Sequence, residues 1–216
     1  MPKLTDRIIL EDISEDWISR NIKKEDSKTY IFLKEFIDIF FGLAGFFFFL
    51  FLFPILSIAI KADSKGAILF SQERIGKNKK KFILYKLRTM SVDGENKELW
   101  REKNINNITR IGKFLRRTHL DELPQSINLL RGEVSFVGPR AEWSTLSELF
   151  EKEIPFYQYR YLVKPGIIGW AQINFPPSRS VEEAKKKFEF DLYYIKKRSF
   201  LLDLEIILKS FQLFRW

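Results

Sequence analysis

The sequence predicts a mostly helical α/β protein, in which a small soluble domain with short strands is anchored by one membrane helix broken at a proline. The first observation behind this fold class is an uncharged apolar stretch from Ile39 to Ile60. The second is a charged fraction of 30%, too high for a protein made mainly of membrane helices. The third is the pattern of the remaining chain, with short strand-like runs and then a long helical tail. A chain of 216 residues can bury a substantial core around these elements.

The apolar stretch is long enough to cross a bilayer. At 1.5 Å per residue, Ile39–Ile60 would form about 33 Å of helix. Pro54 lies inside it, where it removes a backbone hydrogen bond and kinks a helix. Lys and Arg are almost equally frequent on its two flanks, whereas a spanning helix usually has more of them on one side. These features favour a re-entrant helix that enters, turns at Pro54 and leaves on the same side. A kinked spanning helix is the alternative.

Two strands and a helical tail are expected after the apolar stretch. AILFSQERIG and KFILYKLRTM have the composition of short strands and are joined by the turn-like GKNKKK. Residues 91–107 are polar and suit a helix. From Val181 onwards the pattern is helical, and Phe200–Trp216 combines Leu, Ile, Phe and Trp with a few charges. This last part fits an amphipathic interfacial helix in the lipid headgroup layer, with a core-facing helix as the alternative.

Composition excludes several kinds of chemistry. The chain has no cysteine and a single histidine, His119, so disulfides, thiolate metal sites and cysteine nucleophiles are excluded, as are most zinc sites and Ser-His-Asp triads. The net charge of +9 is concentrated between Glu73 and Arg117. Such a field favours a polyanionic partner, which would be nucleic acid, anionic lipid or a phosphorylated substrate. A solvated basic face is the alternative.

The segment RRTHLDELPQ is the best candidate for a reactive site. Thr118 followed by Asp121 has the outline of a capping box, which would place Asp121 and Glu122 in the first turn of a helix. The helix dipole, together with Arg116 and Arg117, would then lower the pKa of Asp121 and keep it ionised. An ionised carboxylate in a cationic pocket can attack phosphorus, and a second carboxylate beside it can hold Mg²⁺. A routine capping box with flanking charges is the alternative.

Four longer motifs place this segment in a family context. SQERIGKNKKKFILYKLRTM, RRTHLDELPQSINLLRGEVSFVGPR, VKPGIIGWAQIN and DLYYIKKRS occur in this order after the proline-broken stretch. Together they resemble the bacterial sugar transferase family, the monotopic polyprenyl-phosphate phosphoglycosyl transferases, from about Phe36 to the C-terminus. The resemblance implies transfer of a sugar-1-phosphate from a UDP-sugar to polyprenyl (undecaprenyl) phosphate through a phosphosugar–aspartyl intermediate. This is the first membrane step of polysaccharide or glycoconjugate assembly.

The resemblance also implies roles for individual residues. The catalytic pair falls on Asp121, the nucleophile, and Glu122, which would assist through Mg²⁺ or by aiding the acceptor phosphate. Both carboxylates are candidate Mg²⁺ ligands. Structural support is an open alternative for the glutamine and arginine of SQERIG, and a plain turn for the first glycine of KPGIIG. The residues expected to bind the substrates are Arg116, Arg117, Lys86, Arg88, Arg140, Gln72, Arg74 and Gly166.

The implied organisation has three parts. Residues 1–35 are an N-terminal lead-in, residues 36–61 a re-entrant helix-break-helix, and residues 62–216 a catalytic domain with an interfacial C-terminal helix. The protein would lie in the bacterial inner membrane with its catalytic domain on the cytoplasmic face. Its partners would be the UDP-sugar, polyprenyl phosphate and membrane lipid. The oligomeric state is open, with a homodimer as one option, and the chain is either a minimal form or a fragment of a larger relative.

Some positions depart from the family pattern. Phe53 precedes Pro54 where serine is common, Ala67 follows Gly66 where proline is usual, and Ala141 follows Arg140 in place of a proline.

Two rival functions remain open at this point. A membrane-tethered nucleic-acid-binding protein would account for the basic stretch, but its aromatic residues are too few and too widely spaced for base stacking. A non-catalytic membrane scaffold would keep the fold, but the intact Asp121-Glu122 pair argues against it. We therefore expect an enzyme, with no nucleic acid among its partners.

Overall fold

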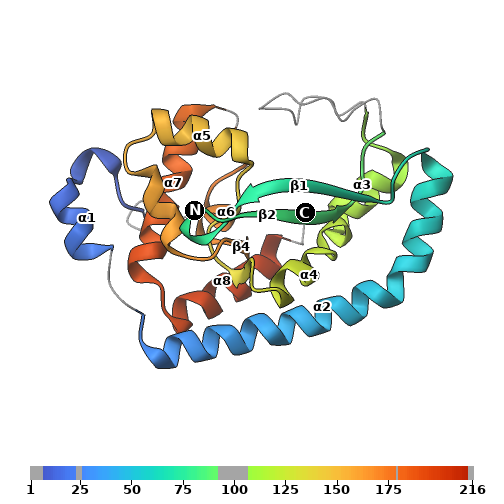
Figure 1. Ribbon diagram of the computed structural model, residues 1–216, viewed down its shortest axis with the longest axis horizontal. Helices are drawn as coiled ribbons and strands as arrows, with labels where there is room; N and C mark the ends of the chain where they lie inside the picture. The colour runs from blue at the N-terminus through green and yellow to red at the C-terminus, as the bar shows by residue number, and fades with distance from the viewer. Residues whose placement is uncertain (1–6, 23–25, 92–106, 179, 214–216) are drawn as a thin grey trace.

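The computed structural model describes residues 7–22, 26–91, 107–178 and 180–213, and a single long helix runs along one side of it (Figure 1). This helix, α2 (Lys28–Asp63), begins at the cap residue Ser27, whose hydroxyl accepts a hydrogen bond from the Tyr30 amide at 3.2 Å. It contains Pro54 and remains helical to Asp63. Figure 1 shows α2 changing direction in its last third, the part that holds this proline.

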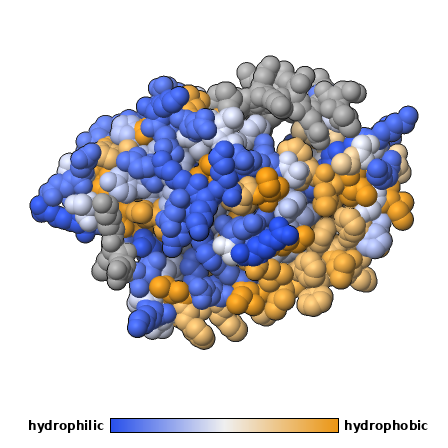
Figure 2. All heavy atoms as spheres, viewed as in Figure 1, coloured by the Kyte–Doolittle hydropathy of each residue, from blue (hydrophilic) through white to orange (hydrophobic). Residues whose placement is uncertain are grey.

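One face of α2 packs against the protein and the other is exposed. Of the described residues, α2 is the one helix long and apolar enough to cross a membrane. The buried face repeats at helical spacing, which is the pattern of a helix that covers a core on one side only. Figure 2 shows apolar residues gathered along α2 at the lower right of the molecule. The most exposed of them are Phe32, Phe36, Phe40, Phe47, Phe51, Ile55 and Ile58.

The two predicted strands are confirmed. β1 (Leu69–Ile75) and β2 (Lys81–Leu87) form an antiparallel pair in which Leu69 lies opposite Leu87 and Ile75 opposite Lys81. The 3-10 turn η2 (Lys77–Lys79) joins them. The predicted helix over residues 91–107 lies almost wholly outside the described residues.

The segment after the hairpin carries the acidic pair. α3 (Arg110–Thr118), the 3-10 turn η5 (Leu120–Glu122) and α4 (Gln125–Leu130) lie close together in the chain. α4 packs directly on α2, because two glycines of α2 let the helices approach. A Cβ on Gly42 would lie 2.8 Å from the Leu130 side chain.

A second small sheet was not predicted. β3 (Ser135–Val137) and β4 (Gly166–Ile168) are parallel, and they are separated by α5 (Ser144–Glu153) and the 3-10 helix η6 (Tyr157–Leu162). α6 (Trp170–Asn174) comes directly after β4. Gly166 serves this sheet with its backbone, since its amide donates to the Pro139 carbonyl at 2.8 Å and a Cβ on it would lie 2.1 Å from the Gly138 nitrogen.

The predicted helical tail is confirmed as two helices, α7 (Val181–Lys197) and α8 (Phe200–Leu213). α8 packs one face on the core, as the core-facing alternative expects, and exposes apolar residues on the other; its placement in the headgroup layer stays a prediction. Ile206 on its inner face is fully buried in the core, while Leu201 and Leu208 on its outer face are exposed. The fold class is therefore mostly helical with a few short strands, as predicted.

The N-terminal lead-in is part of the core, which its polar sequence did not indicate. It contains the 3-10 turn η1 (Leu10–Asp12) and α1 (Glu15–Asn21). Ile18 and Ile22 are buried, and the Ile8 amide donates to the Glu189 carbonyl of α7 at 3.1 Å.

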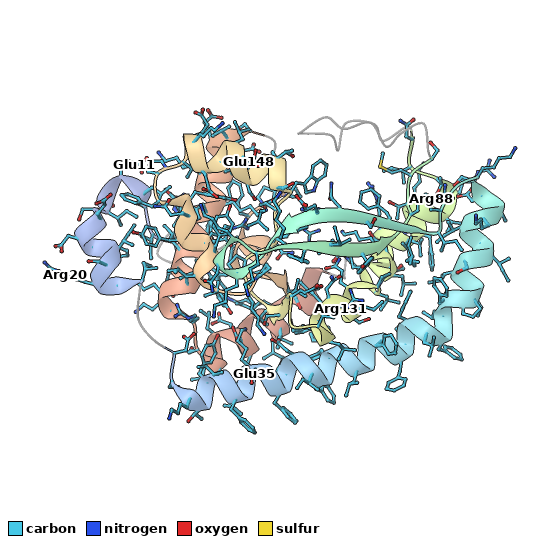
Figure 3. All side chains as sticks on the ribbon, viewed as in Figure 1. Glu11, Arg20, Glu35, Arg88, Arg131 and Glu148 are labelled. Atoms are coloured by element: carbon cyan, nitrogen blue, oxygen red, sulfur yellow. The ribbon has the colours of Figure 1, made fainter. Side chains whose placement is uncertain are left out.

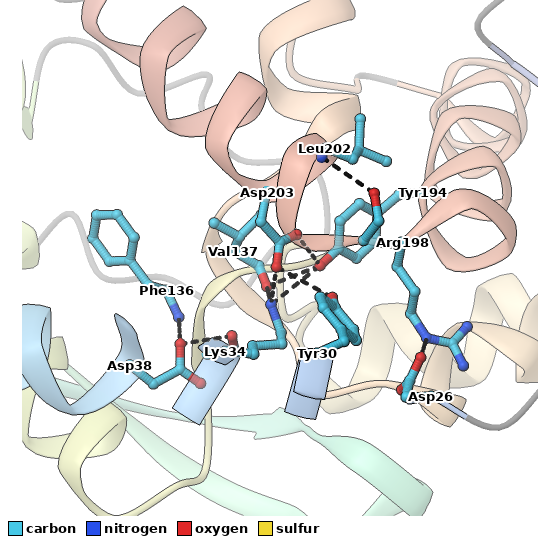
Figure 4. Close-up of polar contacts among 12 residues, drawn as sticks. Asp26, Tyr30, Lys34, Asp38, Phe136, Val137, Tyr194, Arg198, Leu202 and Asp203 are labelled. Carbon is cyan, nitrogen blue, oxygen red and sulfur yellow. Dashed lines mark hydrogen bonds and ion pairs between the residues drawn. The ribbon is translucent and has the colours of Figure 1, made fainter. Parts of the chain in front are cut away.

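Polar side chains fix the start of α2 to the rest of the protein (Figure 4). Lys34 donates to the Asp203 carboxylate of α8 at 2.9 Å and to the Val137 carbonyl of β3 at 2.8 Å. One turn further on, Asp38 accepts from the Ser135 hydroxyl at 2.9 Å and from the Phe136 amide at 2.8 Å. Strand β3 is thereby held against the inner face of α2.

Replacing Gly166 should test the close backbone approach of the second sheet. In Gly166→Ala the added carbon meets backbone atoms, which cannot move aside as a side chain can. We expect a loss of about 3 kcal/mol in the free energy of unfolding, measured by chemical denaturation in detergent. Gly45→Ala in α2 is the comparison: its Cβ would also make a tight contact, 3.2 Å from the Ser126 Cβ, but with a side chain and not with backbone, and alanine favours a helix, so its loss should be clearly smaller. Equal stability of the two variants would contradict this role.

Candidate active site

The acidic pair lies in a turn between two helices. α3 ends at Thr118, and His119 adopts a left-handed conformation with φ 55° and ψ 16° that stops the helix. Asp121 and Glu122 come next, in η5. The predicted capping box is therefore wrong, because the Thr118 hydroxyl donates backwards to the Phe114 carbonyl at 2.9 Å and caps no later helix. A local pattern could not show that His119 would break the chain direction here.

Glu122 is the electrostatic centre of the site. Its Oε1 accepts from the Lys86 ammonium of β2 at 2.6 Å and from the Arg140 guanidinium beyond β3 at 3.1 Å. These two cations hold the pKa of Glu122 well below its usual range, against the opposing effect of burial. Two cations from distant parts of the sequence, Lys86 and Arg140, thus meet at the Glu122 carboxylate.

Asp121 is buried, with a relative exposure of 7%. Burial raises the pKa of its carboxyl above the usual value, and the positive charges of Lys86 and Arg116 offset part of this effect. The predicted lowering of this pKa is wrong in direction, because the prediction placed the side chain at an exposed helix start. Within the described residues, no group donates a hydrogen bond to the Asp121 carboxylate.

Of the two cations predicted in α3, Arg116 lies at the edge of the pair. Arg116 is in the last turn of α3 and donates to the Thr89 hydroxyl at 2.9 Å. It is close enough to Asp121 to favour the ionised carboxylate. Arg117 is its exposed neighbour in the same turn. The structure thus places Arg116 beside the site and gives Arg117 no comparable contact among the described residues.

Arg88 contacts the backbone at the C-terminal end of α2. It is 4% exposed and donates to the carbonyls of Ser64, at 2.8 Å, and of Lys65. Figure 3 shows Arg88 beside the C-terminal end of α2. These contacts satisfy carbonyl groups just after the end of α2, where no further turn of helix is present to pair with them. These contacts fix the end of α2, and the predicted role of Arg88 in substrate binding stays a prediction.

Gln72 and Arg74 support the segment that carries Arg140. Arg74 is buried and donates to the Ala141 carbonyl at 2.8 Å and to the Gln72 side chain at 2.7 Å. Its guanidinium also lies 5.5 Å from the centre of the Trp143 ring. The structural alternative raised for this pair fits these contacts, although Arg74 also lines a cavity beside the acidic pair.

This cavity, of about 740 Å³, opens beside Glu122. One part of its wall is charged, with Arg74, Glu122, Arg140, Glu142, Arg160, Lys187 and Asp191. Another part is apolar and comes from α2, α4, α6 and α8. Such a cavity can hold a ligand that has both an anionic and an apolar portion.

Sequence reasoning missed an inner group of charges in this wall. Arg160 of η6 donates to Asp191 of α7 at 2.9 Å and to the Arg140 carbonyl at 2.6 Å. Glu142 lies 3.2 Å from Lys187, and the surrounding cations lower its pKa to about 2. Asp191 stands in the motif DLYYIKKRS, but nothing local showed that it would face Arg160 across the fold.

Two carboxylates are available for a divalent cation. Among the residues described, no group of three or more acidic or histidine side chains could hold a metal by itself. Asp121 and Glu122 with two or three phosphate oxygens would suit Mg²⁺, which is usually bound by one or two carboxylates together with substrate phosphates and water. The donor set therefore fits a metal that arrives with a phosphorylated ligand.

Comparison with known proteins identifies a family. The model of the family described as bacterial sugar transferase matches residues 29–215. The exopolysaccharide production protein PSS of Rhizobium leguminosarum bv. phaseoli is 39% identical over 81% of this chain and 91% of that protein.

Two longer proteins are similar as well. The UDP-N-acetylgalactosamine-undecaprenyl-phosphate N-acetylgalactosaminephosphotransferase of Aeromonas hydrophila is 36% identical over 96% of this chain and 48% of that protein. The UDP-glucose:undecaprenyl-phosphate glucose-1-phosphate transferase of Klebsiella pneumoniae is 42% identical over 71% of this chain and 34% of that protein. The chain thus spans about half the length of the first and about a third of the second.

The raised pKa of Asp121 predicts that this residue destabilises the fold at neutral pH. Asp121→Asn should raise the midpoint of thermal unfolding at pH 7, because the neutral amide avoids burial of a charge. The folded state binds the Asp121 proton more tightly than the unfolded state does. As the pH rises from the pKa of Asp121 in the unfolded state through its higher pKa in the folded state, the wild type therefore loses stability relative to the variant. The advantage of the variant should therefore vanish at acidic pH, where the carboxyl is protonated in both states.

Thermal unfolding of both proteins across this pH range is the measurement. Glu148→Gln, which changes an exposed glutamate of α5, should show no such pH-dependent gain. A variant less stable than the wild type at pH 7 and equal to it in acid would contradict the raised pKa.

Proposed function

The chain belongs to the bacterial sugar transferase family, and we propose that it is a phosphoglycosyl transferase that moves a sugar-1-phosphate from a UDP-sugar to undecaprenyl phosphate. The reaction would be the first membrane step in assembling a polysaccharide or glycoconjugate. The observation that carries the proposal is the buried Asp121 carboxylate next to Glu122, whose own carboxylate accepts hydrogen bonds from Lys86 and Arg140.

In the first step, an oxygen of Asp121 attacks the phosphorus that bears the sugar. The bond from this phosphorus to the bridging oxygen breaks, and UMP leaves with that oxygen and its electron pair. An acyl phosphate joins the sugar phosphate to Asp121. Lys86 and Arg140 lie where they would offset the negative charge that builds up on the phosphate oxygens.

In the second step, a phosphate oxygen of undecaprenyl phosphate attacks the same phosphorus. The bond to Asp121 breaks, which restores the carboxylate and releases undecaprenyl-diphosphate sugar. Because Asp121 holds the sugar phosphate in between, the soluble donor and the lipid acceptor need not occupy the site together.

Mg²⁺ is the proposed cofactor. Asp121 and Glu122 are the residues that would hold it together with the donor phosphates. When bound, the ion would neutralise phosphate charge and so favour both the approach of the carboxylate and the departure of UMP. Glu122 would keep its place through Lys86 and Arg140 whether or not the ion is present.

The proposed location is the bacterial inner membrane, with Asp121 on the cytoplasmic side where UDP-sugars are made. Support comes from the exposed apolar face of α2 and the exposed leucines of α8, which suit hydrocarbon and headgroup surroundings. The change of direction in α2 suits a re-entrant hairpin.

Asp121→Asn should lower UMP release from a UDP-sugar by at least about a thousandfold, because the amide cannot form the acyl phosphate. The measurement is UMP release in detergent with undecaprenyl phosphate and Mg²⁺. UDP-N-acetylgalactosamine and UDP-glucose are the first donors to test, because the names of the two longer relatives specify these sugars. Removing Mg²⁺ with EDTA should stop release, and adding it back should restore it.

Glu148→Gln is the matched control, since this glutamate is exposed on α5 and does not line the cavity. It should release UMP at the wild-type rate. Wild-type turnover in Asp121→Asn would end the covalent mechanism.

The re-entrant path of α2 predicts that both ends of the helix face the same side of the membrane. The cysteine-free chain allows single cysteines at Lys28→Cys and Lys65→Cys, two exposed positions at the two ends. A membrane-impermeant maleimide added to spheroplasts should label neither, and added to inverted vesicles should label both. Labelling of one position from each side would show a spanning helix instead.

A further inference from the structure

The cavity has an apolar half that the chemistry at Asp121 does not use. Its walls include Phe41 and Gly45 of α2 and Ile207 and Phe211 of α8. Leu123, directly after the acidic pair, continues this lining towards the charged half. An apolar wall of this kind does nothing for a phosphate or a sugar, so it calls for a hydrocarbon ligand.

The apolar half reaches the outer surface where α2 and α8 are exposed. Phe211 lines the cavity and is 61% exposed, so it stands at the rim. On α8, Leu208 lies next to it on the exposed face, and on α2 Phe40 is exposed beside the cavity-lining Phe41. The rim is thus surrounded by apolar side chains of the two helices proposed to contact lipid, so a chain leaving the cavity there would pass directly into the bilayer.

The rest of the wall is charged, with four cations, Arg74, Arg140, Arg160 and Lys187, and the carboxylates of Glu122, Glu142 and Asp191. Arg140 and Arg74 line it, and Lys86 reaches Glu122 at its edge. A ligand matching both halves has an anionic head and a hydrocarbon tail, with the head towards Asp121. A wholly apolar ligand would shield the charged wall from water at a cost, and a wholly polar one would leave Phe41 and Ile207 uncovered.

We infer that the apolar half of the cavity binds the first isoprene units of the polyprenyl acceptor, which enters between α2 and α8 with its phosphate directed at Asp121. The inference rests on the proposed function and adds the site of the acceptor tail to it. Phe211 is the rim of this site, and Ser210, which is buried and lines the cavity, is part of its wall.

Two matched substitutions on α8 test the tail site. Phe211→Glu places a carboxylate on the rim, whereas Leu208→Glu places one on the same exposed face outside the cavity wall. Both should weaken membrane binding alike, so rates are compared per vesicle-bound enzyme. A third variant, Ser210→Leu, fills the apolar half without adding charge.

Each half-reaction is measured separately in vesicles. The burst of UMP without acceptor reports formation of the aspartyl adduct from UDP-N-acetylgalactosamine or UDP-glucose. Product formed on adding undecaprenyl phosphate reports the second step. We expect Phe211→Glu to lower the second step at least about tenfold relative to Leu208→Glu, because a carboxylate against a hydrocarbon chain is strongly disfavoured. Ser210→Leu should raise the KM for undecaprenyl phosphate, and all three variants should keep the UMP burst.

Chain length gives an independent readout. Geranyl phosphate, with two isoprene units, has less tail to place at the rim, so Phe211→Glu should slow its use less than that of undecaprenyl phosphate. Equal loss of the second step in Phe211→Glu and Leu208→Glu would overturn the inference. Loss of the UMP burst in Phe211→Glu and Ser210→Leu would overturn it too, since the cavity would then hold the donor. Absence of a burst in the wild type contradicts the proposed function itself, and so is a distinct result.

Discussion

The site depends on one carboxylate that is shared by two cations. Glu122 accepts from Lys86 on the hairpin and from Arg140 beyond β3, so a single side chain joins segments that the sequence separates widely. A buried carboxylate destabilises the fold unless it is fully paired. Removing Lys86 or Arg140 would leave the Glu122 charge only partly paired and should therefore lower stability. Its neighbour Asp121 is influenced by the charges of Lys86 and Arg116, which favour the ionised carboxylate. The pairing at Glu122 thus orders the turn that also carries Asp121, the proposed nucleophile.

The long helix fixes where this carboxylate lies relative to the apolar surface. At its start, Lys34 and Asp38 hold strand β3, which leads directly into Arg140. At its end, the Asp63 carboxylate accepts from the Ile111 amide at 2.8 Å, which holds the first turn of α3. α2 therefore binds both segments that flank the acidic turn. The long helix and the acidic turn are therefore packed into one rigid unit, and the polar contacts that join them lie on the face of α2 opposite its exposed phenylalanines.

The sequence predicted the features that depend on local pattern and on long motifs. The two strands of the hairpin, the helical tail and the acidic pair were predicted from periodicity, turn residues and the family resemblance.

The predicted capping box was wrong because His119 adopts a left-handed conformation that ends the helix, and a single sequence does not reveal such a backbone conformation. The direction of the Asp121 pKa failed with it, since burial is a property of the whole fold. Arg88 has the right chemistry for a phosphate but meets the carbonyls that end α2. The pairing of Arg160 with Asp191 joins helices far apart in the chain.

One cavity with a charged and an apolar part suits the proposed reaction, whose two substrates would differ strongly in polarity. A site that had to bind a nucleotide sugar and a lipid phosphate at once would need room for both and a wall suited to each. If Asp121 carries the sugar phosphate between steps, UMP leaves before the acceptor arrives, and only the phosphorus must stay in place. The charged half then serves a phosphate in each step, whereas the apolar half serves the second substrate alone. Damage to the apolar wall should therefore separate the two half-reactions, which damage to Glu122 cannot do because both steps share its cations.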